Sequence, residues 1–353
     1  MALAERINAF VKLGDFLSQF ATINPQSNSE VALNDVFFDG MKHQLKLTQE
    51  HNGWFTKENT CFAIDNWAKA LQLEKLENWM ANYNLDTVSP KKVAVVMAGN
   101  IPLVGFHDFL SVLLAGHEIL VKQSSNDKHL LPYLAKYLEY VEPSFKGKIA
   151  FTDEKLTGFD AVIATGSNNT ARYFEYYFKD KPNIIRKNRN SVAILTGNET
   201  KAQLEALSDD IFTYFGLGCR SVSKLFVPKG YDFQDFFGGM YGKSDIMNNA
   251  KYANNYDYNK AVYLMSLFDI LENGFLMIKE DSQYASPIAT VFYEYYDDLD
   301  SLQAKLIADA ADIQCIVADI NLENEIKFGH TQQPELQDYA DGVDTLQFLS
   351  TLA

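Results

Sequence analysis

The spacing of hydrophobic residues changes near residue 90 of this 353-residue chain. Before that point apolar residues recur at helical spacing, and in NWAKALQLEKLENWMANY one stripe contains Leu73, Leu76, Met80 and Tyr83. We therefore expect residues 1–90 to be mostly helical, with this stripe facing a core.

After Ser89-Pro90 short apolar runs alternate with helical segments, a pattern typical of a parallel α/β sheet. The pattern predicts strands at 92–98, 117–123, 160–166 and 191–197 and helices at 103–115, 128–140 and 170–178. A second α/β unit follows, beginning with a helix in TKAQLEALSDDIFTYFG that opens with a capping box from Thr200 to Gln203 and stops at Gly216. Its predicted strands are SKLFVPKG, GFLMIKE, IATVFYEYY and IQCIVADI.

These patterns give an α/β fold class with two parallel-sheet α/β domains and an N-terminal helical region. The expected division is residues 1–193 for the helical region and a nucleotide-binding domain, 194–330 for a catalytic domain, and 331–353 for a C-terminal arm. The chain has no linker rich in Pro, Gly or Ser, which indicates that the two domains pack closely.

Composition narrows the classes of function. A net charge of -15 argues against a general nucleic-acid binder and requires a local basic patch for any anionic ligand. The longest apolar run near the middle, IPLVGFHDFLSVLLAG, is interrupted by Pro102, His107 and Asp108 and is too short to span a bilayer. The N-terminus lacks the apolar core of a signal peptide. We therefore expect a soluble, cytoplasmic protein with no membrane span.

The three cysteines show no spacing typical of a disulfide framework or a zinc site, so no metal is expected. Cys315 lies within a predicted strand, and Cys61 also fits a packed thiol. Cys219 is different, because in GLGCR two glycines precede it and allow close approach of a ligand, and the cationic Arg220 follows it. From these residues alone, a buried structural thiol and a reactive nucleophile both stay open.

Three strand ends are placed where open α/β sheets bind ligands. AGNIPLVG offers the amide of Asn100, which could equally cap the following helix. Two further strand ends carry candidate ligand contacts: Lys122, Ser124 and Ser125 in ILVKQSSND, and Gly166 and Ser167 in ATGSNNTARYF. The same residues could equally be ordinary surface and turn residues. The segment IIRKNRN contains Arg186 in the densest basic cluster of the chain, which predicts either a phosphate contact or a solvated face. Neither a G-x-G-x-x-G fingerprint nor a Walker A sequence occurs.

Taken in order, AGNIPL, ILVKQSS, ATGS and GLGCRSVSKLFVP resemble the motifs of the aldehyde dehydrogenase superfamily, and within it the luminescence-type (LuxC-like) acyl-CoA reductases. The resemblance covers residues 93–228 and, more weakly, FGHTQQPELQDYADGVDTLQFL near the C-terminus. It implies an aldehyde dehydrogenase-like fold with a Rossmann-like nucleotide domain.

The resemblance also implies roles for individual residues. Cys219 would be the nucleophile, with Asn100 and the Cys219 backbone N–H as oxyanion donors. Lys122, Ser124, Ser125, Gly166 and Ser167 would bind the cofactor. Ser125 stands where many NAD-dependent relatives carry an acidic residue, which favours NADPH (NADP), because serine would not repel a 2'-phosphate.

Two departures from the superfamily bear on the direction of the reaction. The usual general-base glutamate aligns near Arg186, and the ribose-binding motif is absent, with Glu280 or Asp281 as only a loose replacement. A missing base would handicap hydrolysis of an acyl-enzyme but not its reduction, which favours a reductase. His330 in FGHTQQP could supply an acid, or be a structural histidine. The reduced length leaves the usual oligomerisation hairpin in doubt, with a homodimer as one expected assembly.

The leading hypothesis is an NADPH-dependent acyl-CoA reductase that turns a fatty acyl thioester, as acyl-CoA or acyl-protein, into an aldehyde through a covalent acyl-cysteine. Two alternatives remain at this stage. One is an aldehyde dehydrogenase that acts oxidatively, and the other is a catalytically silent partner subunit that binds nucleotide.

Overall fold

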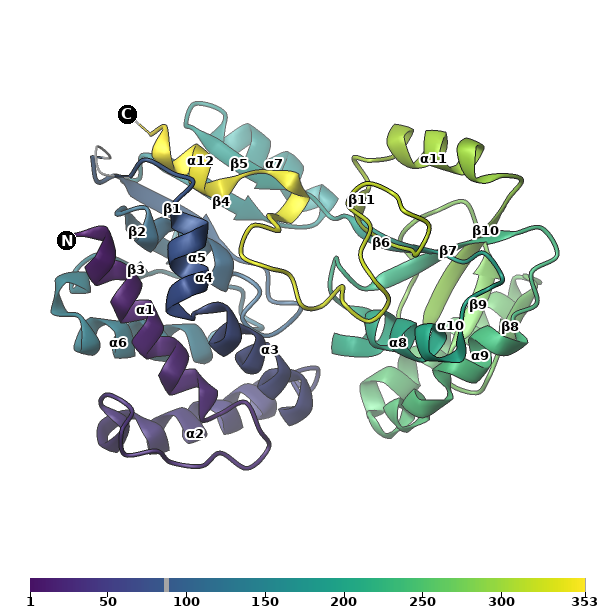
Figure 1. The fold of residues 1–353 in the computed structure, drawn as a ribbon, viewed down its shortest axis with the longest axis horizontal. Coiled ribbons are helices and arrows are strands. Elements are labelled where there is room, and N and C mark those ends of the chain that lie inside the picture. The colour runs from purple at the N-terminus through teal and green to yellow at the C-terminus, as the bar shows by residue number, and fades with distance from the viewer. Residues whose placement is uncertain (86–88, 353) are drawn as a thin grey trace. The chain divides into compact units, whose positions relative to one another are not determined.

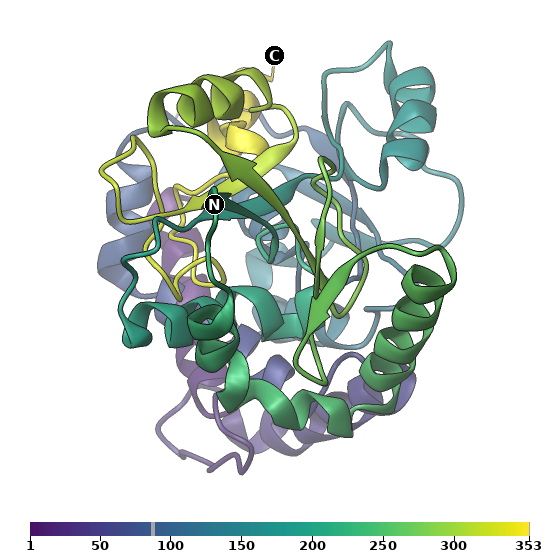
Figure 2. The same cartoon turned by 90° about the vertical axis from the view of Figure 1, so that its right-hand side faces the viewer.

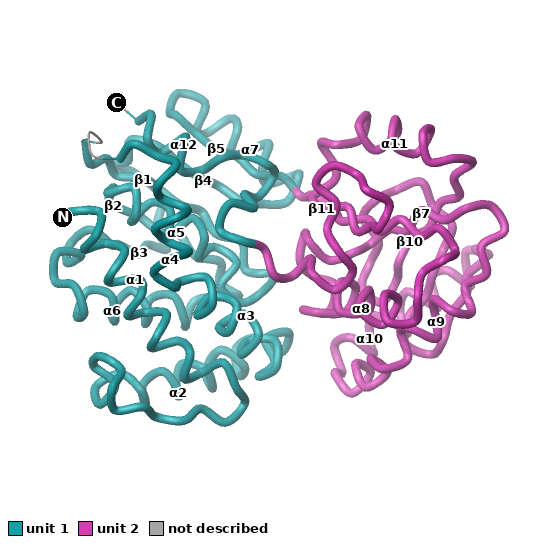
Figure 3. The backbone as a smooth tube through the Cα atoms, viewed as in Figure 1, with its two compact units in different colours: residues 1–187, 335–353 teal, residues 188–334 magenta. Residues whose placement is uncertain are grey.

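The computed structural model describes residues 1–85 and 89–352 (Figure 1). It divides into two compact units, drawn in different colours in Figure 3. The first unit contains residues 1–187 and 335–353, and the second contains residues 188–334. The chain therefore leaves the first unit once and returns to it at the C-terminus.

Helices build the N-terminal part of the first unit, as the periodicity predicts. They are α1 (Leu3–Ser18), α2 (Asn34–His51), α3 (Lys57–Ala70) and α4 (Leu73–Met80). Of the predicted stripe, Leu76 and Met80 are buried, whereas Leu73 is 50% exposed because it is the first residue of α4.

A five-stranded parallel sheet follows, in the order β3-β2-β1-β4-β5 of a doubly wound α/β fold. Its strands are β1 (Lys92–Val96), β2 (Glu118–Lys122), β3 (Ile149–Phe151), β4 (Ala161–Thr165) and β5 (Asn183–Arg186). The helical elements between them are α5 (Phe106–Leu114), α6 (Leu130–Val141), the 3-10 turn η1 (Pro143–Phe145) and α7 (Asn168–Phe178). The sequence pattern did not predict β3, which is short, or β5, whose residues were interpreted as part of a basic cluster.

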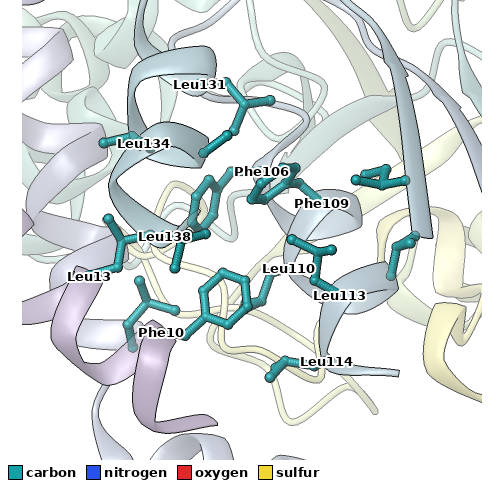
Figure 4. Packing of buried hydrophobic residues seen from close by; sticks show 14 of the residues in the cluster. Phe10, Leu13, Phe106, Phe109, Leu110, Leu113, Leu114, Leu131, Leu134 and Leu138 are labelled. Carbon is teal, nitrogen blue, oxygen red and sulfur yellow. The ribbon is translucent and has the colours of Figure 1, made fainter. Parts of the chain in front are cut away.

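Both faces of this sheet are buried. Val93 and Val95 face the larger core, where α1, α5 and α6 interdigitate (Figure 4). Ala94 faces the other side and packs with residues of β4 and α7. A strand that is apolar on both faces is expected at the centre of a parallel sheet.

The second unit is built on a six-stranded sheet in the order β11-β6-β7-β10-β9-β8, in which all pairs are parallel except β8 with β9. Its strands are β6 (Asn190–Ile194), β7 (Val222–Pro228), β8 (Ile270–Glu272), β9 (Met277–Glu280), β10 (Thr290–Tyr296) and β11 (Ile313–Val317). Its helical elements are α8 (Lys201–Phe212), η2 (Thr213–Gly216), α9 (Gln234–Met240), η3 (Tyr241–Asn248), α10 (Ala250–Met265) and α11 (Leu299–Ala308). Within this unit α11 covers one face of the sheet, and α8 to α10 lie on the other (Figures 1 and 2).

The division into units differs from the predicted domains at both boundaries. The predicted limit at residue 193 falls inside β6, which pairs with β7 and β11 of the second sheet. An apolar run such as SVAILTG has the same pattern whichever sheet it joins, so periodicity could not assign it. Residues 86–88 and 353 of the predicted ranges lie outside the described residues.

The predicted C-terminal arm is divided between the units. Residues 331–334 belong to the second unit, and residues 335–353 to the first. There the chain forms η4 (Ala340–Gly342) and α12 (Thr345–Ser350), which buries Leu346 and Leu349 against the core of the first unit. Residues 335–352 are thus an integral part of the first unit, with Leu336, Leu346 and Leu349 in its core.

Within the described residues 1–85 and 89–352, no helix combines the length and the apolar character that a membrane crossing requires. The longest apolar run near the middle of the chain, IPLVGFHDFLSVLLAG, contains the nine-residue helix α5.

Candidate active site

The turn after β1 carries Asn100, which is exposed at the carboxyl end of the central strand. The turn is longer than predicted, since α5 begins at Phe106 and Leu103 is held in the left-handed region at a φ of 57°. The backbone N–H of Leu103 donates to Oδ2 of the buried Asp127 at 2.8 Å. The amide of Asn100 therefore projects from a turn whose backbone is fixed by a buried carboxylate.

Lys122, Ser124 and Ser125 follow β2, next to that turn. The Lys122 ammonium donates to the backbone carbonyls of Asp153 and Glu154, at 3.3 and 3.0 Å, where the chain leaves β3. Ser124 lies against Gly99, because a Cβ at Gly99 would stand 2.5 Å from the Ser124 side chain. Ser125 is exposed.

Gly166 and Ser167 follow β4. The Ser167 hydroxyl caps α7 by accepting the backbone N–H of Thr170 at 3.3 Å. A Cβ at Gly166 would come within 3.1 Å of Thr170, so the tight entry to α7 favours glycine. β1, β2 and β4 are adjacent parallel strands, and their carboxyl ends therefore bring the predicted residues of this unit to one edge of the sheet.

Arg186 does not share this exposed setting. It ends β5, is only 5% exposed, and donates from Nη1 to Asp108 Oδ2 at 2.6 Å and from Nη2 to Thr345 Oγ1 at 2.8 Å. The expectation of a solvated face is therefore wrong for Arg186, and its guanidinium binds an interior carboxylate in place of the alternative ligand, a phosphate.

Cys219 lies in the loop between η2 and β7 of the second unit and is half-buried. Its backbone carbonyl accepts a hydrogen bond from the Ser191 hydroxyl at 2.9 Å, which ties the loop to the start of β6. Cys315, in contrast, is buried in β11. The thiol of Cys61 in α3 has a raised pKa, because it is partly buried and lies near the negative charge of Glu58. Cys61 is half-buried like Cys219, so Cys219 is favoured over it by its place on a fixed loop and by the raised pKa of the Cys61 thiol, and over Cys315 by accessibility.

The backbone just before this loop is strained. Tyr214, Phe215 and Gly216 have φ values of 55°, 59° and 74°, so the helix α8 ends earlier than the predicted stop at Gly216. Two non-glycine residues in the left-handed region cost about 1–2 kcal/mol each. Both side chains are buried, and their packing holds the conformation. Such strain is concentrated near functional sites.

The segment that contains His330 is fastened to the Cys219 loop. Arg220 donates from Nε to the carbonyl of Thr331 at 2.6 Å, and the Gln332 amide donates to the Ser221 hydroxyl at 3.3 Å. From α8, the Asp210 carboxylate accepts the backbone N–H groups of Gly329 and Thr331 at 2.6 and 2.9 Å, together with the Thr331 hydroxyl. His330 itself is exposed between these buried contacts.

Glu280 is exposed at the carboxyl end of β9. The neighbouring Asp281 is engaged by Lys279, and its backbone carbonyl accepts from the buried Lys224 at 3.2 Å. Of the two acidic residues, only Glu280 has an exposed side chain.

Sequence reasoning missed two buried carboxylates that fix these loops. Asp210 stands three residues after Leu207, on the buried stripe of α8, and a charge on an apolar stripe signals a buried partner. Burial raises the pKa of Asp210, opposed by the hydrogen bonds from Gly329 and Thr331. Asp127 gave no such signal, because NDKHL is polar throughout its first part. In the aromatic segment YDFQDFFGGMY, Phe233, Phe236 and Met240 are buried in the core, whereas Tyr241 is 68% exposed.

A model of the acyl-CoA reductase (LuxC) family matches residues 53–236, more than half of the chain. The chain belongs to the LuxC acyl-CoA reductase family. The matched segment runs from the end of α2 to α9 and includes Asn100, Lys122, Gly166 and Cys219, whereas Glu280 and His330 lie beyond it. Membership supports an oxidoreductase activity that involves an aldehyde.

Solved aldehyde dehydrogenases share the fold of this LuxC-family chain. Aldehyde dehydrogenase 21 from Physcomitrella patens, solved with succinate, is 14% identical with a TM-score of 0.64, over 91% of this chain and 74% of its own. An indole-3-acetaldehyde dehydrogenase from P. syringae, solved with NAD+, is 13% identical with a TM-score of 0.63, over 92% and 74%. A benzaldehyde dehydrogenase from Corynebacterium glutamicum is 13% identical with a TM-score of 0.63, over 90% and 76%. Among curated proteins no match was found.

In the described part of the chain, no group of three or more His, Cys, Asp or Glu side chains is arranged to hold a metal ion.

Proposed function

We propose that this protein reduces a fatty acyl thioester, acyl-CoA or acyl-protein, to the aldehyde with NADPH, through a covalent acyl group on Cys219. The observation that carries the proposal is the setting of Cys219. It is half-buried in a loop whose backbone is held by Ser191 and whose next residue, Arg220, anchors a second loop. The family match supports the substrate class.

The residues of the chain divide the chemistry as follows. The Cys219 thiolate attacks the thioester carbonyl, the new C–S bond forms, and the original thiol departs as a thiolate. Asn100 donates a hydrogen bond to the carbonyl oxygen as negative charge develops there. After reduction, the thiohemiacetal oxygen loses its proton, the C–S bond breaks, and Cys219 leaves as a thiolate while the aldehyde is released. His330 is the proposed group that exchanges the proton with that oxygen.

A nicotinamide cofactor supplies, when bound, the hydride that reduces the acyl group. The carboxyl edge of the first sheet fits such a ligand, because Gly166 keeps the entry to α7 narrow and Ser124 and Ser125 offer hydroxyl groups after β2, on the other side of β1. Lys122 would contact the adenosine ribose or its phosphate. Glu280 is the proposed ribose contact from the second unit.

The preference for NADPH rests on Ser125, where an acidic side chain would repel a 2'-phosphate. One observation favours NADH instead. Lys122 binds the backbone of Asp153 and Glu154, whose exposed carboxylates follow β3 at the same edge. Ser125 is one proposed neighbour of the 2'-phosphate, and the carboxylates of Asp153 and Glu154 would be further neighbours that repel it. Side-by-side kinetics with both cofactors decide between them.

The direction of the reaction follows from what stands in place of a hydrolytic base. By the resemblance, that position falls near Arg186, which is buried and paired with Asp108. A guanidinium in an ion pair cannot activate water. We therefore expect the acyl-enzyme to lack the base that oxidative relatives use, which favours reduction.

The test is an acyl-CoA chain-length series with NADPH and with NADH, followed by nicotinamide absorbance, with wild type and Cys219→Ala. We expect NADPH consumption by wild type and none by the variant, with Cys315→Ala as the matched control. Full activity in Cys219→Ala would rule out the mechanism. An intact-mass increase of one acyl group on wild type, absent from Cys219→Ala, would exclude a catalytically silent subunit. Aldehyde-dependent formation of NADPH that exceeds the reductive rate would favour the oxidative alternative.

A further inference from the structure

Asp127 is a buried carboxylate on the segment after β2, which carries Ser124, and its side chain binds the turn that carries Asn100. Its side chain is 8% exposed, and its Oδ2 accepts the backbone N–H of Leu103 at 2.8 Å. Among the described residues, Oδ1 has no hydrogen-bond partner. A half-satisfied buried carboxylate is costly, which calls for a reason to retain it.

The backbone of Asp127 is fixed as firmly as its side chain. Its N–H donates to the carbonyl of Ser124 at 3.2 Å, and its carbonyl accepts from the Gln123 side-chain amide at 3.0 Å. The loop that follows β2 is therefore rigid at the point where the carboxylate leaves it.

The turn held by this carboxylate needs an external anchor. Leu103 is in the left-handed region, which is unfavourable for a residue with a branched side chain. At the start of the turn, Gly99 lies so close to Ser124 and to the backbone nitrogen of Asp127 that a Cβ would stand 2.5 and 3.3 Å from them. The turn thus touches the segment after β2 at both of its ends.

We infer that Asp127 is a positioning residue that fixes the turn carrying Asn100 against the segment carrying Ser124 and Ser125. It acts through the Leu103 N–H and touches neither substrate nor cofactor. The kinetic part of this inference rests on the function proposed above, whereas the structural part does not.

The electrostatic setting makes the inference measurable. Burial raises the pKa of Asp127 to about 6, and the Leu103 hydrogen bond opposes that rise. The charged or titratable groups on the surrounding segments are Lys122 at the end of β2, Lys128 and His129 on its own loop, and His51 at the end of α2, which contacts the Ser125 carbonyl at 2.6 Å. The turn from residue 98 to 105 carries none.

A raised pKa means that the folded state favours the protonated carboxyl. Its contribution to stability is complete below the ordinary pKa of 3.8 and is lost as the pH rises through about 6. At pH 8 the ionised carboxylate therefore destabilises the protein, and Asp127→Asn, which keeps one acceptor oxygen, removes that charge.

The experiment compares Asp127→Asn, Asp127→Ala and wild type, with Asp39→Asn on the exposed face of α2 as the control for charge. Hydrogen exchange of the Leu103 amide reads out the turn directly. We expect Asp127→Ala to raise its exchange rate at least about tenfold, because the acceptor is lost, and Asp127→Asn to leave it protected. Unchanged exchange in Asp127→Ala would overturn the inference.

Thermal unfolding at pH 5 and pH 8 gives an independent readout. The Tm of Asp127→Asn minus that of wild type should be about 3 °C larger at pH 8 than at pH 5. For Asp39→Asn this difference should be the same at both pH values. A pH-independent difference would mean that the carboxylate carries no cost, and would contradict the proposed reason for its position.

The kinetic readout is a double-mutant cycle with Asn100→Ala. Asp127→Ala should lower kcat about tenfold in the wild-type background but less than about twofold in Asn100→Ala, because the turn no longer carries a donor to be positioned. Equal effects in both backgrounds would rule out positioning of Asn100. If wild type has no thioester reductase activity, the proposed function fails, and the exchange and unfolding measurements still decide the role of Asp127.

Discussion

Arg186 and Asp108 form an ion pair inside the first unit, with Nη1 2.6 Å from Oδ2 and side chains that are 6% and 8% exposed. The pair joins the end of β5 to α5, and the second guanidinium nitrogen reaches Thr345 at the start of α12. The strand β5 and the helices α5 and α12 thus meet at the buried guanidinium of Arg186.

Breaking this pair from one side should be strongly destabilising. Asp108→Ala leaves the Arg186 charge buried without its carboxylate, so we expect a loss of about 3–5 kcal/mol in the free energy of unfolding. Chemical denaturation measures it, with Glu175→Ala as the control, since the Lys187–Glu175 pair is half exposed and contributes about 0–1 kcal/mol. The double variant that carries both Asp108→Leu and Arg186→Met should lose less free energy of unfolding than Asp108→Ala alone, because it leaves no unpaired charge buried.

The hydrogen bond from Arg220 to Thr331 should matter for turnover more than for stability. Arg220→Met removes the donor that holds the His330 segment to the Cys219 loop, so we expect kcat to fall about tenfold. Arg189→Met is a matched control, because Arg189 also donates to backbone carbonyls of the second unit, those of Ala310 and Ile313. A similar loss in both variants would indicate a general effect on folding.

The fold class and the placement of the candidate residues at the strand ends could be predicted because they depend on local patterns. Short apolar runs that alternate with helical segments identified β1, β2 and β4, and a parallel sheet then brings Asn100, Lys122 and Gly166 to one edge. The capping box at Thr200 and Gln203 is confirmed by their reciprocal hydrogen bonds. The LuxC-like assignment is confirmed by the family match.

What could not be predicted depends on partners far away in the chain. Arg186 resembled a surface cation because its partner, Asp108, lies 78 positions earlier. Asp108 was informative in itself, since a lone carboxylate within an apolar run needs a buried partner. The membership of β6 in the second sheet likewise depends on its pairing with β7 and β11, which periodicity does not encode.

Cofactor preference should respond to charge at the edge of the first sheet. Ser125→Glu places a carboxylate where a 2'-phosphate is proposed, so kcat/KM with NADPH should fall at least about tenfold while that with NADH changes less. Replacing both Asp153 and Glu154 by their amides should have the opposite effect and raise the NADPH to NADH ratio. Steady-state kinetics at two ionic strengths would check this, because exposed charges are screened by salt. An unchanged ratio in both variants would remove this edge from the phosphate site.

Two histidines attach the C-terminal residues to the first unit in their neutral forms. His107 donates from Nε2 to the carbonyl of Leu336 at 2.9 Å, and His117 donates from Nε2 to that of Leu349 at 3.0 Å. Because Nδ1 of His117 accepts the backbone N–H of Lys91 at 3.1 Å, this ring cannot gain a proton without losing that bond. Burial lowers the pKa of both imidazoles.

Acidification should therefore loosen the C-terminal segment before the rest of the first unit. A histidine whose pKa is lowered by folding contributes stability above its ordinary value of 6.5, and this stability is lost as the pH falls below it, since the unfolded state then binds more protons. We expect exchange of the amides in 345–350 to accelerate between pH 7.5 and pH 5.5, after correction for intrinsic rates. His117→Gln should show fast exchange at both pH values, because glutamine cannot make both hydrogen bonds of the ring with the same geometry. Protection of α12 that is the same at both pH values in wild type would show that these imidazoles do not control its attachment.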